Sequence, residues 1–273
     1  MGGPHPHRWH ALGRYLLSLR RFWGTSLATQ LEYQLNALIE LLAMLANLAG
    51  SVGLLWLFYR QGVALGGWSW HGALVVLGAY TGLNGFTSTL LQPNLSRIVT
   101  HVQEGTLDFV LLKPIDSQFW LSLRSFNPAG IPELVLGLVL MLWAAWADRG
   151  ALRPELILAT VVVLLAAAAI LYALWFVLAT TAIWFVKTWN ATEVLRAALS
   201  AGRYPVSAFP ATVRLFFTLV LPVAFLTTVP AEILLGRSGV GWMLASLGVA
   251  FCALALSRGF WRLALRYYTS ASS

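Results

Sequence analysis

Polar side chains recur at helical spacing along two otherwise apolar stretches of this 273-residue chain. In the stretch 35–59, one helical face carries a set spaced by three or four residues: Asn36, Glu40, Met44, Asn47 and Ser51. In the stretch 71–91, a second face carries Tyr80, Asn84 and Ser88. Such faces line a polar route or form hydrogen bonds between helices, and the residues alone leave both interpretations open. Because an ionised carboxylate is costly in hydrocarbon, we expect Glu40 to face protein, water or a cation.

The sequence contains no recognisable motif for catalysis, for nucleotide binding or for a metal. A phosphate-binding loop needs a Gly-Lys pair, whereas the only lysines, Lys113 and Lys187, follow Leu112 and Val186. The five histidines all lie outside the centres of the apolar stretches: His5, His7, His10, His71 and His101. We therefore expect no catalytic, cofactor-binding or metal-binding residue in this chain.

The elements that carry these polar faces are predicted from composition. Hydrophobic residues make up 59% of the chain and charged residues only 10%, against roughly 25% charged in an average soluble domain. This composition excludes a soluble enzyme and a disordered protein, and the single cysteine, Cys252, excludes an internal disulfide. Because the apolar runs are continuous rather than alternating, we predict an all-α polytopic membrane protein, with one transmembrane domain over residues 1–273.

Stretches without charge predict six transmembrane helices, near 35–59, 71–91, 131–147, 156–185, 215–235 and 240–256. In the fifth, Pro222 leaves a backbone carbonyl unpaired and is expected to kink the helix. Pro230 and Glu232 suggest a break followed by a short re-entrant piece. Before the first span, residues 8–30 repeat Trp and Leu at steps of three and four, which predicts an amphipathic interfacial (elbow) helix. A cytoplasmic helix packed on protein is the alternative.

The distribution of basic residues predicts the orientation. With the N-terminus inside, 14 Lys and Arg fall in the inside segments and 4 in the outside loops. Both termini are then cytoplasmic, and the longest inside segments are 92–130 and 186–214. The cell (plasma or inner) membrane is the expected location. The net charge of +8 follows from this bias, and the dispersed basic residues do not indicate nucleic-acid binding.

The inside segment 92–130 has helical order of its own. Glu104-Gly105 is expected to end a first helix, Thr106 to cap a second over 107–112, and Pro114 to stop it. The second helix is largely apolar, although it lies outside the membrane. Either it folds back on the chain's own helices or a partner subunit covers it.

Three segments resemble the permease subunits of type-two ABC exporters, the ABC-2 transporter superfamily. The first is E-G-T-L-D-F-V-L-L-K-P at 104–114. The second, at 204–237, contains Y-P-V-S-A-F-P-A-T-V-R, L-P-V-A-F and V-P-A-E-I-L-L-G-R, and the third is the C-terminal F-W-R-L-A-L-R-Y-Y-T-S-A-S-S at 260–273. The similarity covers most of the chain, and the second segment is the most specific.

The resemblance implies a six-span exporter subunit, preceded by an elbow helix, that pairs with a second, identical or related permease half. Separate ATPase subunits would bind ATP and Mg, so that this chain is not itself an enzyme and holds no cofactor. By the resemblance, the loop 92–130 is the cytoplasmic coupling loop, with these coupling residues: Glu104, Gly105, Thr106, Leu107, Asp108, Phe109, Leu111, Lys113 and Pro114. Spans one, two and five would surround the substrate route, with these candidate residues: Asn36, Glu40, Asn84 and Pro222.

Two other functions remain as alternatives. A passive channel or an ion-coupled carrier would need no ATPase and would use Glu40 as its ion site, although no second deep charge is evident beside Glu40. An intramembrane enzyme, such as a lipid transferase, would need a base or a metal, which the sequence lacks. Apart from membrane lipid, the partners expected for the exporter are the ATPase subunit and the second permease half. The transported substrate is not indicated.

Overall fold

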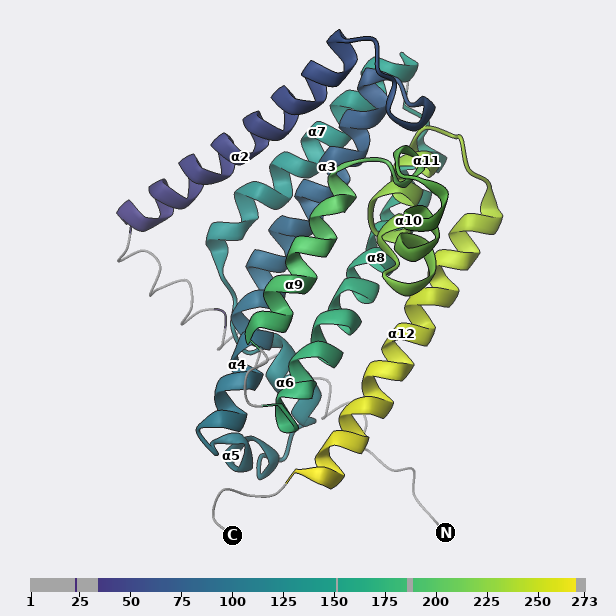
Figure 1. Ribbon diagram of the computed structural model, residues 1–273. Helices are drawn as coiled ribbons and strands as arrows, with labels where there is room; N and C mark the ends of the chain where they lie inside the picture. Colours follow the sequence, from purple (N-terminus) through teal and green to yellow (C-terminus); the bar gives the residue numbers. More distant parts are fainter. Residues whose placement is uncertain (1–22, 24–33, 151, 186–188, 269–273) are drawn as a thin grey trace, which may run out of the picture.

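The protein is a bundle of long helices in the computed structural model, which describes residues 23, 34–150, 152–185 and 189–268 (Figure 1). Every regular element within these ranges is a helix or a helical turn, and five helices are long and apolar enough to cross a membrane. A bent pair of helices is a sixth candidate. The predicted all-α, polytopic fold is thus confirmed. The elbow helix predicted over 8–30 lies outside the described residues, apart from Trp23, and so do both chain termini.

The first half of the chain forms these elements in order: α2 (Gln34–Arg60), the turn η1 (Leu65–Gly67), α3 (Trp70–Phe86), the π-helical turn η2 (Thr87–Leu91), α4 (Gln92–Gln103), α5 (Leu107–Leu111), α6 (Ser117–Leu123), the turn η3 (Pro128–Gly130) and α7 (Ile131–Arg149). We call the end of the bundle that carries α5 the inner end, and the opposite end, where α2 meets α3, the outer end (Figure 1).

The second half forms α8 (Pro154–Thr180), the turn η4 (Thr181–Ile183), α9 (Trp189–Leu199), the turns η5 (Ser200–Arg203) and η6 (Val206–Ala208), and α10 (Ala211–Leu215). Two π-helical segments follow, η7 (Phe216–Val220) and η8 (Ala224–Thr228), and then α11 (Val229–Leu234) and α12 (Val240–Tyr267). The last helix returns the chain to the inner end, beside α5 (Figure 1).

The centre of the bundle is a continuous run of 34 residues, Trp70–Gln103, made by α3, η2 and α4. It packs on α7 so closely that the two backbones touch. A Cβ added to Gly137 of α7 would lie 2.1 Å from the Gly82 nitrogen, and one on Gly78 would lie 2.6 Å from the Met141 nitrogen. Only glycines at these positions allow this approach, because any added Cβ would overlap the neighbouring backbone.

The second main contact joins α8 to α12. Phe176 of α8 and Trp261 of α12 meet edge to face, with ring centroids 5.5 Å apart, and both side chains are buried. Alanines along α8, among them Ala167 and Ala179, let the neighbouring helices approach its apolar surface. This packing supports the inner half of α12, where the site residues described below are located.

The segment 186–214 was predicted to lie on the inside, and this prediction was wrong because the segment spans both ends of the bundle. Ser207 is at the outer end, where its hydroxyl accepts a hydrogen bond from the Trp68 indole at 2.9 Å and donates one to the Gly66 carbonyl at 3.3 Å. The chain therefore returns from the inner to the outer end through α9 and η5. Sequence inspection missed this return because Arg196 and Arg203 interrupt the apolar pattern.

The predicted fifth span, 215–235, is also not one continuous crossing. Its two arms, Ala211–Val220 and Ala224–Leu234, meet at 79°. The break falls at Pro222, as predicted, because proline cannot donate the next helical hydrogen bond. Both ends of the pair lie near Trp68, at the outer end. Before the pair, the Ser207 hydroxyl accepts a hydrogen bond from the Trp68 indole. After the pair, the Arg237 guanidinium lies over the Trp68 ring. The pair is thus re-entrant.

Candidate functional site

A polar cavity of about 450 Å³ opens between α2, α3 and α9. Its wall is built from four segments: Ala43, Met44 and Asn47 of α2, Tyr80 and Asn84 of α3, Glu133 of α7, and Glu193, Arg196, Ala197, Ser200 and Arg203 of α9 and η5. Both polar faces predicted from the sequence contribute to this one wall. The third contribution, from α9, was not predicted.

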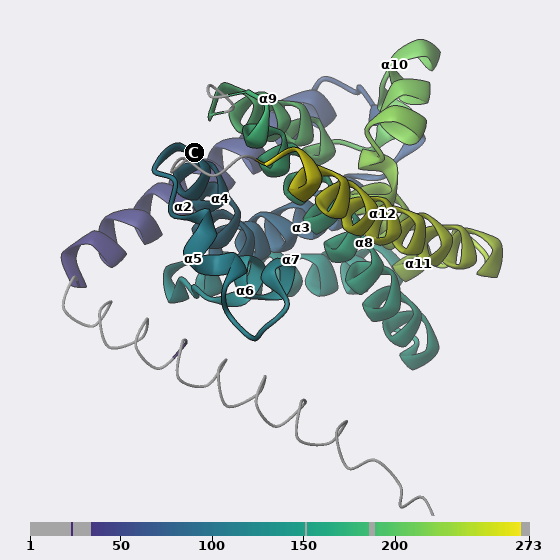
Figure 2. The same ribbon diagram turned by 90° about the horizontal axis from the view of Figure 1, so that it is seen from below.

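The tilt of α2 creates the cavity (Figures 1 and 2). The outer half of α2 is anchored to the bundle, because Leu55 is buried and the Tyr59 hydroxyl donates to the Trp68 carbonyl at 2.9 Å. The inner half diverges from the bundle and leaves apolar side chains such as Leu38 and Leu42 exposed. The space between this inner half, α3 and α9 is the cavity.

The outer end of the bundle is closed above the cavity. The Trp68 side chain is buried there, and its ring lies 4.8 Å below the Arg237 guanidinium. Arg237 in turn pairs with Asp148 at 3.4 Å, and the Ser69 hydroxyl donates to the same carboxylate. These contacts join the loop before α3 to the ends of α7 and α11. A molecule in the cavity would therefore meet packed side chains on the outer side.

Arg203 lies at the closed end of the cavity, near the middle of the bundle. Its Nη1 donates to the Ser51 hydroxyl at 3.2 Å, and its guanidinium lies 5.1 Å from the centre of the Tyr80 ring. Ser51 is nine residues before the end of α2, and Tyr80 is ten residues into α3. At 1.5 Å per residue this is a depth of about 15 Å, or half of a ~30 Å hydrocarbon core. An arginine at this depth costs about 2.5–3.5 kcal/mol on insertion scales.

The inner part of the wall is crossed by an interhelical hydrogen bond. The Asn84 Nδ2 donates to the Glu133 Oε1 at 2.7 Å, and the Ser88 hydroxyl donates to the other carboxylate oxygen at 3.3 Å. The polar face of α3 therefore does both of the things that its sequence left open: it bonds to a neighbouring helix and it lines the cavity. No group of three His, Cys, Asp or Glu in the described ranges lies close enough to hold a metal ion.

The four predicted pathway residues are not placed together. Asn84 lines the cavity. Glu40 is exposed on the diverging half of α2, one turn from Met44, and does not line the cavity. Asn36 belongs to α2, but its side chain lies outside the described residues. Pro222 stands at the break of the re-entrant pair, beside Val223, which lines a smaller adjoining cavity.

Sequence reasoning missed the residues that give the cavity its charge. Glu133 was not singled out from the sequence as a site residue, and Arg196 and Arg203 were placed in the inside segment 186–214 as basic residues outside the membrane. A signal was present, because Glu193, Arg196, Ser200 and Arg203 recur at steps of three, four and three. That is the spacing of one helical face, and it matches the rule that was applied to the first two spans.

At the inner end, α5 presents an apolar surface. Leu107 and Val110 are buried in the bundle, whereas Phe109 is 68% exposed and Leu112 is 81% exposed. Leu111 is exposed to a lesser degree. The predicted inside helix therefore does fold back on the chain with one face while its other face stays uncovered. We call Phe109, Leu111 and Leu112 the α5 knob.

The turns around α5 follow the predicted pattern except at one residue. Gly105 has a positive φ of 67° and ends α4, together with exposed Glu104, and Lys113 and Pro114 follow the helix, where both are exposed. Thr106 does not cap α5, contrary to the prediction. Its hydroxyl lies 2.7 Å from the His101 Nδ1 instead, because its backbone is already helical. The side chain of Asp108 is half-buried.

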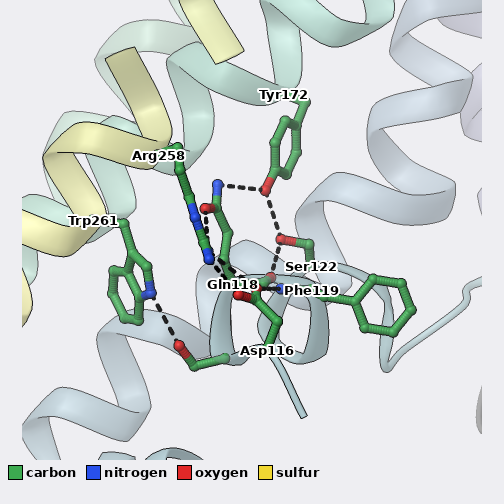
Figure 3. Close-up of polar contacts among 8 residues, drawn as sticks. Asp116, Gln118, Phe119, Ser122, Tyr172, Arg258 and Trp261 are labelled. Carbon is green, nitrogen blue, oxygen red and sulfur yellow. Dashed lines mark hydrogen bonds and ion pairs between the residues drawn. The ribbon is translucent and has the colours of Figure 1, made fainter. Parts of the chain in front are cut away.

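A network of polar contacts fastens the next helix, α6, to α12 and α8 (Figure 3). The Arg258 guanidinium pairs with both oxygens of Asp116 and donates to the Gln118 Oε1 at 3.0 Å. Gln118 Nε2 donates to the Tyr172 hydroxyl at 3.1 Å, and the Ser122 hydroxyl lies 2.8 Å from the same atom. We call Asp116, Gln118, Ser122, Tyr172 and Arg258 the inner clamp.

The inner clamp also begins α6. The Asp116 Oδ1 accepts the amide N–H of Phe119 at 2.9 Å, which is the arrangement of an N-cap. Beside it, the buried Trp261 indole donates to the Ser117 hydroxyl at 3.1 Å. Burial alone would raise the pKa of the Asp116 carboxyl. The bond to Arg258 and the Phe119 amide outweigh burial, so that this pKa lies below its ordinary value.

A search of curated proteins returned no match to the chain. The family described as "ABC-2 family transporter protein" matches residues 45–272, which include the α5 knob and all of the cavity wall except Ala43 and Met44. Because the match spans most of the sequence, the chain belongs to the ABC-2 transporter family and is a multi-pass membrane permease subunit of an ABC transporter, a transport subunit rather than a catalytic one.

Proposed function

We propose that this permease forms one half of an exporter that is driven by a separate ATPase docked on the α5 knob. The observation that carries the proposal is the exposed apolar surface of Phe109, Leu111 and Leu112, on a helix whose other face is buried. A patch of this kind outside the apolar core is the feature expected of a protein interface. The ATP and Mg then belong to the partner chain, and the inner end of the bundle faces the cytoplasm.

The inner clamp supplies the path from the knob to the transmembrane helices. A push on α5 reaches α6 through the short connection at 112–116, and α6 is fastened to Arg258 of α12 and Tyr172 of α8. Because charge-assisted hydrogen bonds resist displacement, the inner halves of these two helices move with the loop. Transport then follows from the different affinities of two bundle states for substrate.

The cavity between α2, α3 and α9 is proposed as this half's share of the substrate route. It is polar, it lies at the depth of the hydrocarbon core, and it is closed at the outer end by the Trp68 contacts. One side of its wall is α2, whose inner half tilts away from the bundle (Figure 2). A second permease half, identical or related, would cover that side and complete the passage.

The test replaces the knob without disturbing the bundle. Phe109→Asp combined with Leu112→Asp places two charges on exposed side chains, so folding should be retained while ATPase docking is lost. Val63→Asp is the matched control, because Val63 is an exposed apolar residue in the connection between α2 and α3, at the outer end. Each tagged chain is purified in mild detergent, and the co-purified ATPase subunit is identified by mass spectrometry and assayed for ATP hydrolysis.

We expect an ATPase subunit to co-purify with the wild-type chain and with Val63→Asp. The amount of ATPase recovered with the double variant should be at least about tenfold lower, as for loss of an interface anchor. Equal recovery of ATPase and equal ATP hydrolysis in all three would refute docking on the α5 knob. The single variants Asp108→Arg and Leu111→Asp change two further residues of α5. Each should also weaken ATPase docking in the same assay.

A further inference from the structure

The charges of the cavity are unequally partnered. Glu133 accepts hydrogen bonds from Asn84 and Ser88, as described above. Within the described ranges, neither Arg196 nor Arg203 has a carboxylate within 4 Å. Arg196 lies 5.8 Å from the Trp175 ring, near the inner part of the wall. Glu133 and Glu193 line the same cavity, but neither carboxylate forms an ion pair with Arg203, so the charge of Arg203 at the closed end is not directly neutralised by the described side chains.

The donors of Arg203 are also incompletely used. A guanidinium has five N–H donors in a fixed fork. In Arg203 one nitrogen bonds to Ser51, whereas the buried Nε has no hydrogen-bond partner among the described residues. The Tyr80 ring packs 5.1 Å from the guanidinium centre and helps to hold it in place. An arginine that is held in place with unused donors is suited to a group that accepts two parallel hydrogen bonds.

We propose that the substrate of this permease carries an oxyanion, a phosphate or a carboxylate, which docks on Arg203 at the closed end of the cavity. The inference rests on the proposed role of the cavity as the substrate route, and it adds the chemical class of the substrate. A cation is disfavoured there because Arg203 would repel it. A neutral molecule would leave the charge of Arg203 uncompensated at the middle of the hydrocarbon depth.

The oxyanion can belong to two kinds of molecule, an amphiphile or a small soluble ion. The wall of the cavity also contains the apolar side chains of Ala43 and Met44 on α2, which suit an acyl tail. The shared chemistry is the oxyanion, and the two sources differ in whether a tail is needed for binding. Dodecyl phosphate and inorganic phosphate are therefore compared as probes.

The experiment measures equilibrium binding of radiolabelled dodecyl phosphate to the purified full chain in a neutral detergent. Arg203→Gln removes the charge but keeps a polar side chain, and Arg203→Lys keeps the charge. Arg214→Gln is the matched control, because Arg214 is exposed on α10 and does not line the cavity. Asn47→Asp is a nearly isosteric second variant that puts a carboxylate into the same wall. Thermal unfolding verifies that each variant is folded.

We expect saturable binding to the wild type and to Arg214→Gln. Arg203→Gln should weaken it by roughly 10- to 100-fold, the loss expected on removal of a charge-assisted hydrogen bond. Arg203→Lys should stay within about fivefold of the wild type, because the charge remains while the planar fork is lost. Asn47→Asp should weaken binding by at least about tenfold through repulsion and competition for Arg203.

Competition with unlabelled compounds identifies the source of the oxyanion. Displacement by inorganic phosphate at the same concentration as dodecyl phosphate supports a soluble oxyanion, and displacement only by the alkyl compound supports an amphiphile. Equal displacement by dodecyltrimethylammonium would overturn the proposal. So would unchanged affinity in folded Arg203→Gln and Asn47→Asp, or the absence of saturable binding to the wild type.

Failure of this inference can be told apart from failure of the proposed function. Binding of dodecyl phosphate needs no ATPase, whereas the knob variants report only on docking of the partner. Intact binding with no ATPase on the chain would refute the drive mechanism and keep the oxyanion site. Intact ATPase docking with no Arg203-dependent binding would refute the oxyanion site and keep the drive mechanism.

Discussion

The arginine of the inner clamp and the arginine of the cavity differ in how fully the protein satisfies their charge. Arg258 of the inner clamp pairs with both oxygens of Asp116 and also donates to Gln118. Arg203 of the cavity has one hydrogen bond, to Ser51, and a buried Nε without a partner among the described residues. The clamp arginine is satisfied by the protein, and the cavity arginine is not.

The difference separates a structural network from a binding surface. A satisfied charge network stabilises one arrangement of the helices around it, so it can carry a displacement from α6 to α12 without rearranging. An incompletely satisfied arginine destabilises the fold but gains energy when a complementary group arrives. The inner end should therefore be stiff and sensitive to truncation, whereas the cavity should tolerate loss of its charge.

The largest expected effect is at the inner end. Trp261→Ala removes a side chain that is 1% exposed, together with its ring contact to Phe176 and its bond to Ser117. The free energy of unfolding should fall by about 3–5 kcal/mol, as for other large buried aromatic residues. Trp242→Ala on the outer half of the same helix is the control, because Trp242 is 45% exposed. Trp242→Ala should lower the free energy of unfolding by less than about 1 kcal/mol.

Reversible unfolding in mixed micelles, titrated with an anionic detergent, measures both variants. Equal decreases in the free energy of unfolding for the two variants would show that the inner half of α12 is no better packed than its outer half. In that case α12 would not provide a stiff support for the coupling loop.

The second effect compares the two arginines directly by one substitution. Arg258→Met removes the partner of Asp116 and Gln118, and should lower the free energy of unfolding by about 1–2 kcal/mol, because the pair is partly exposed. Arg203→Met replaces a poorly satisfied charge at mid-depth by an apolar side chain of similar length. It should raise the free energy of unfolding by about 1 kcal/mol.

Opposite signs for the same change are the diagnostic result, measured by the same unfolding titration. A loss at Arg203 as large as that at Arg258 would mean that the cavity arginine is part of the structural framework. The comparison between a stiff inner end and a tolerant cavity would then fail.

The sequence predicted the inner end well because its signals are local. A glycine at the end of α4 and a proline after α5 act within a few residues, and both take the expected positions in the structure. The apolar surface of α5 was also evident from its residues. The partners Tyr172 and Arg258 of the inner clamp were not predictable, because they lie 50 or more residues from α6.

The cavity was predicted only in part, and the reason is the rule used to find membrane helices. That rule selects long uncharged stretches, so it found the polar faces of α2 and α3. It rejected α9 and η5, which are short and carry Arg196 and Arg203, and it took the re-entrant pair for the fifth crossing. A helix that is shielded by neighbours and lines a cavity can carry charge, which no measure of local hydropathy reveals.

The smallest expected effect is the pH dependence of the inner clamp. The folded-state pKa of Asp116 lies below its ordinary value of 3.8, so its ionised form is favoured by folding. The stabilisation should be fully present above about pH 3.8 and should be lost as the pH falls through the lower, folded-state pKa. Unfolding titrations of the wild type and Asp116→Asn between pH 7 and pH 2 measure it.

The informative quantity is the difference in unfolding free energy between the two proteins, because other carboxylates contribute equally to both. This difference should be constant from pH 7 to about pH 4.5 and should shrink below pH 3.8. Arg203→Met should show the same decline as the wild type, since the cavity arginine does not contact Asp116. A difference that stays constant down to pH 2 would mean that the Asp116 charge does not stabilise the inner clamp, and that α6 is held to α12 mainly by the packing of Trp261.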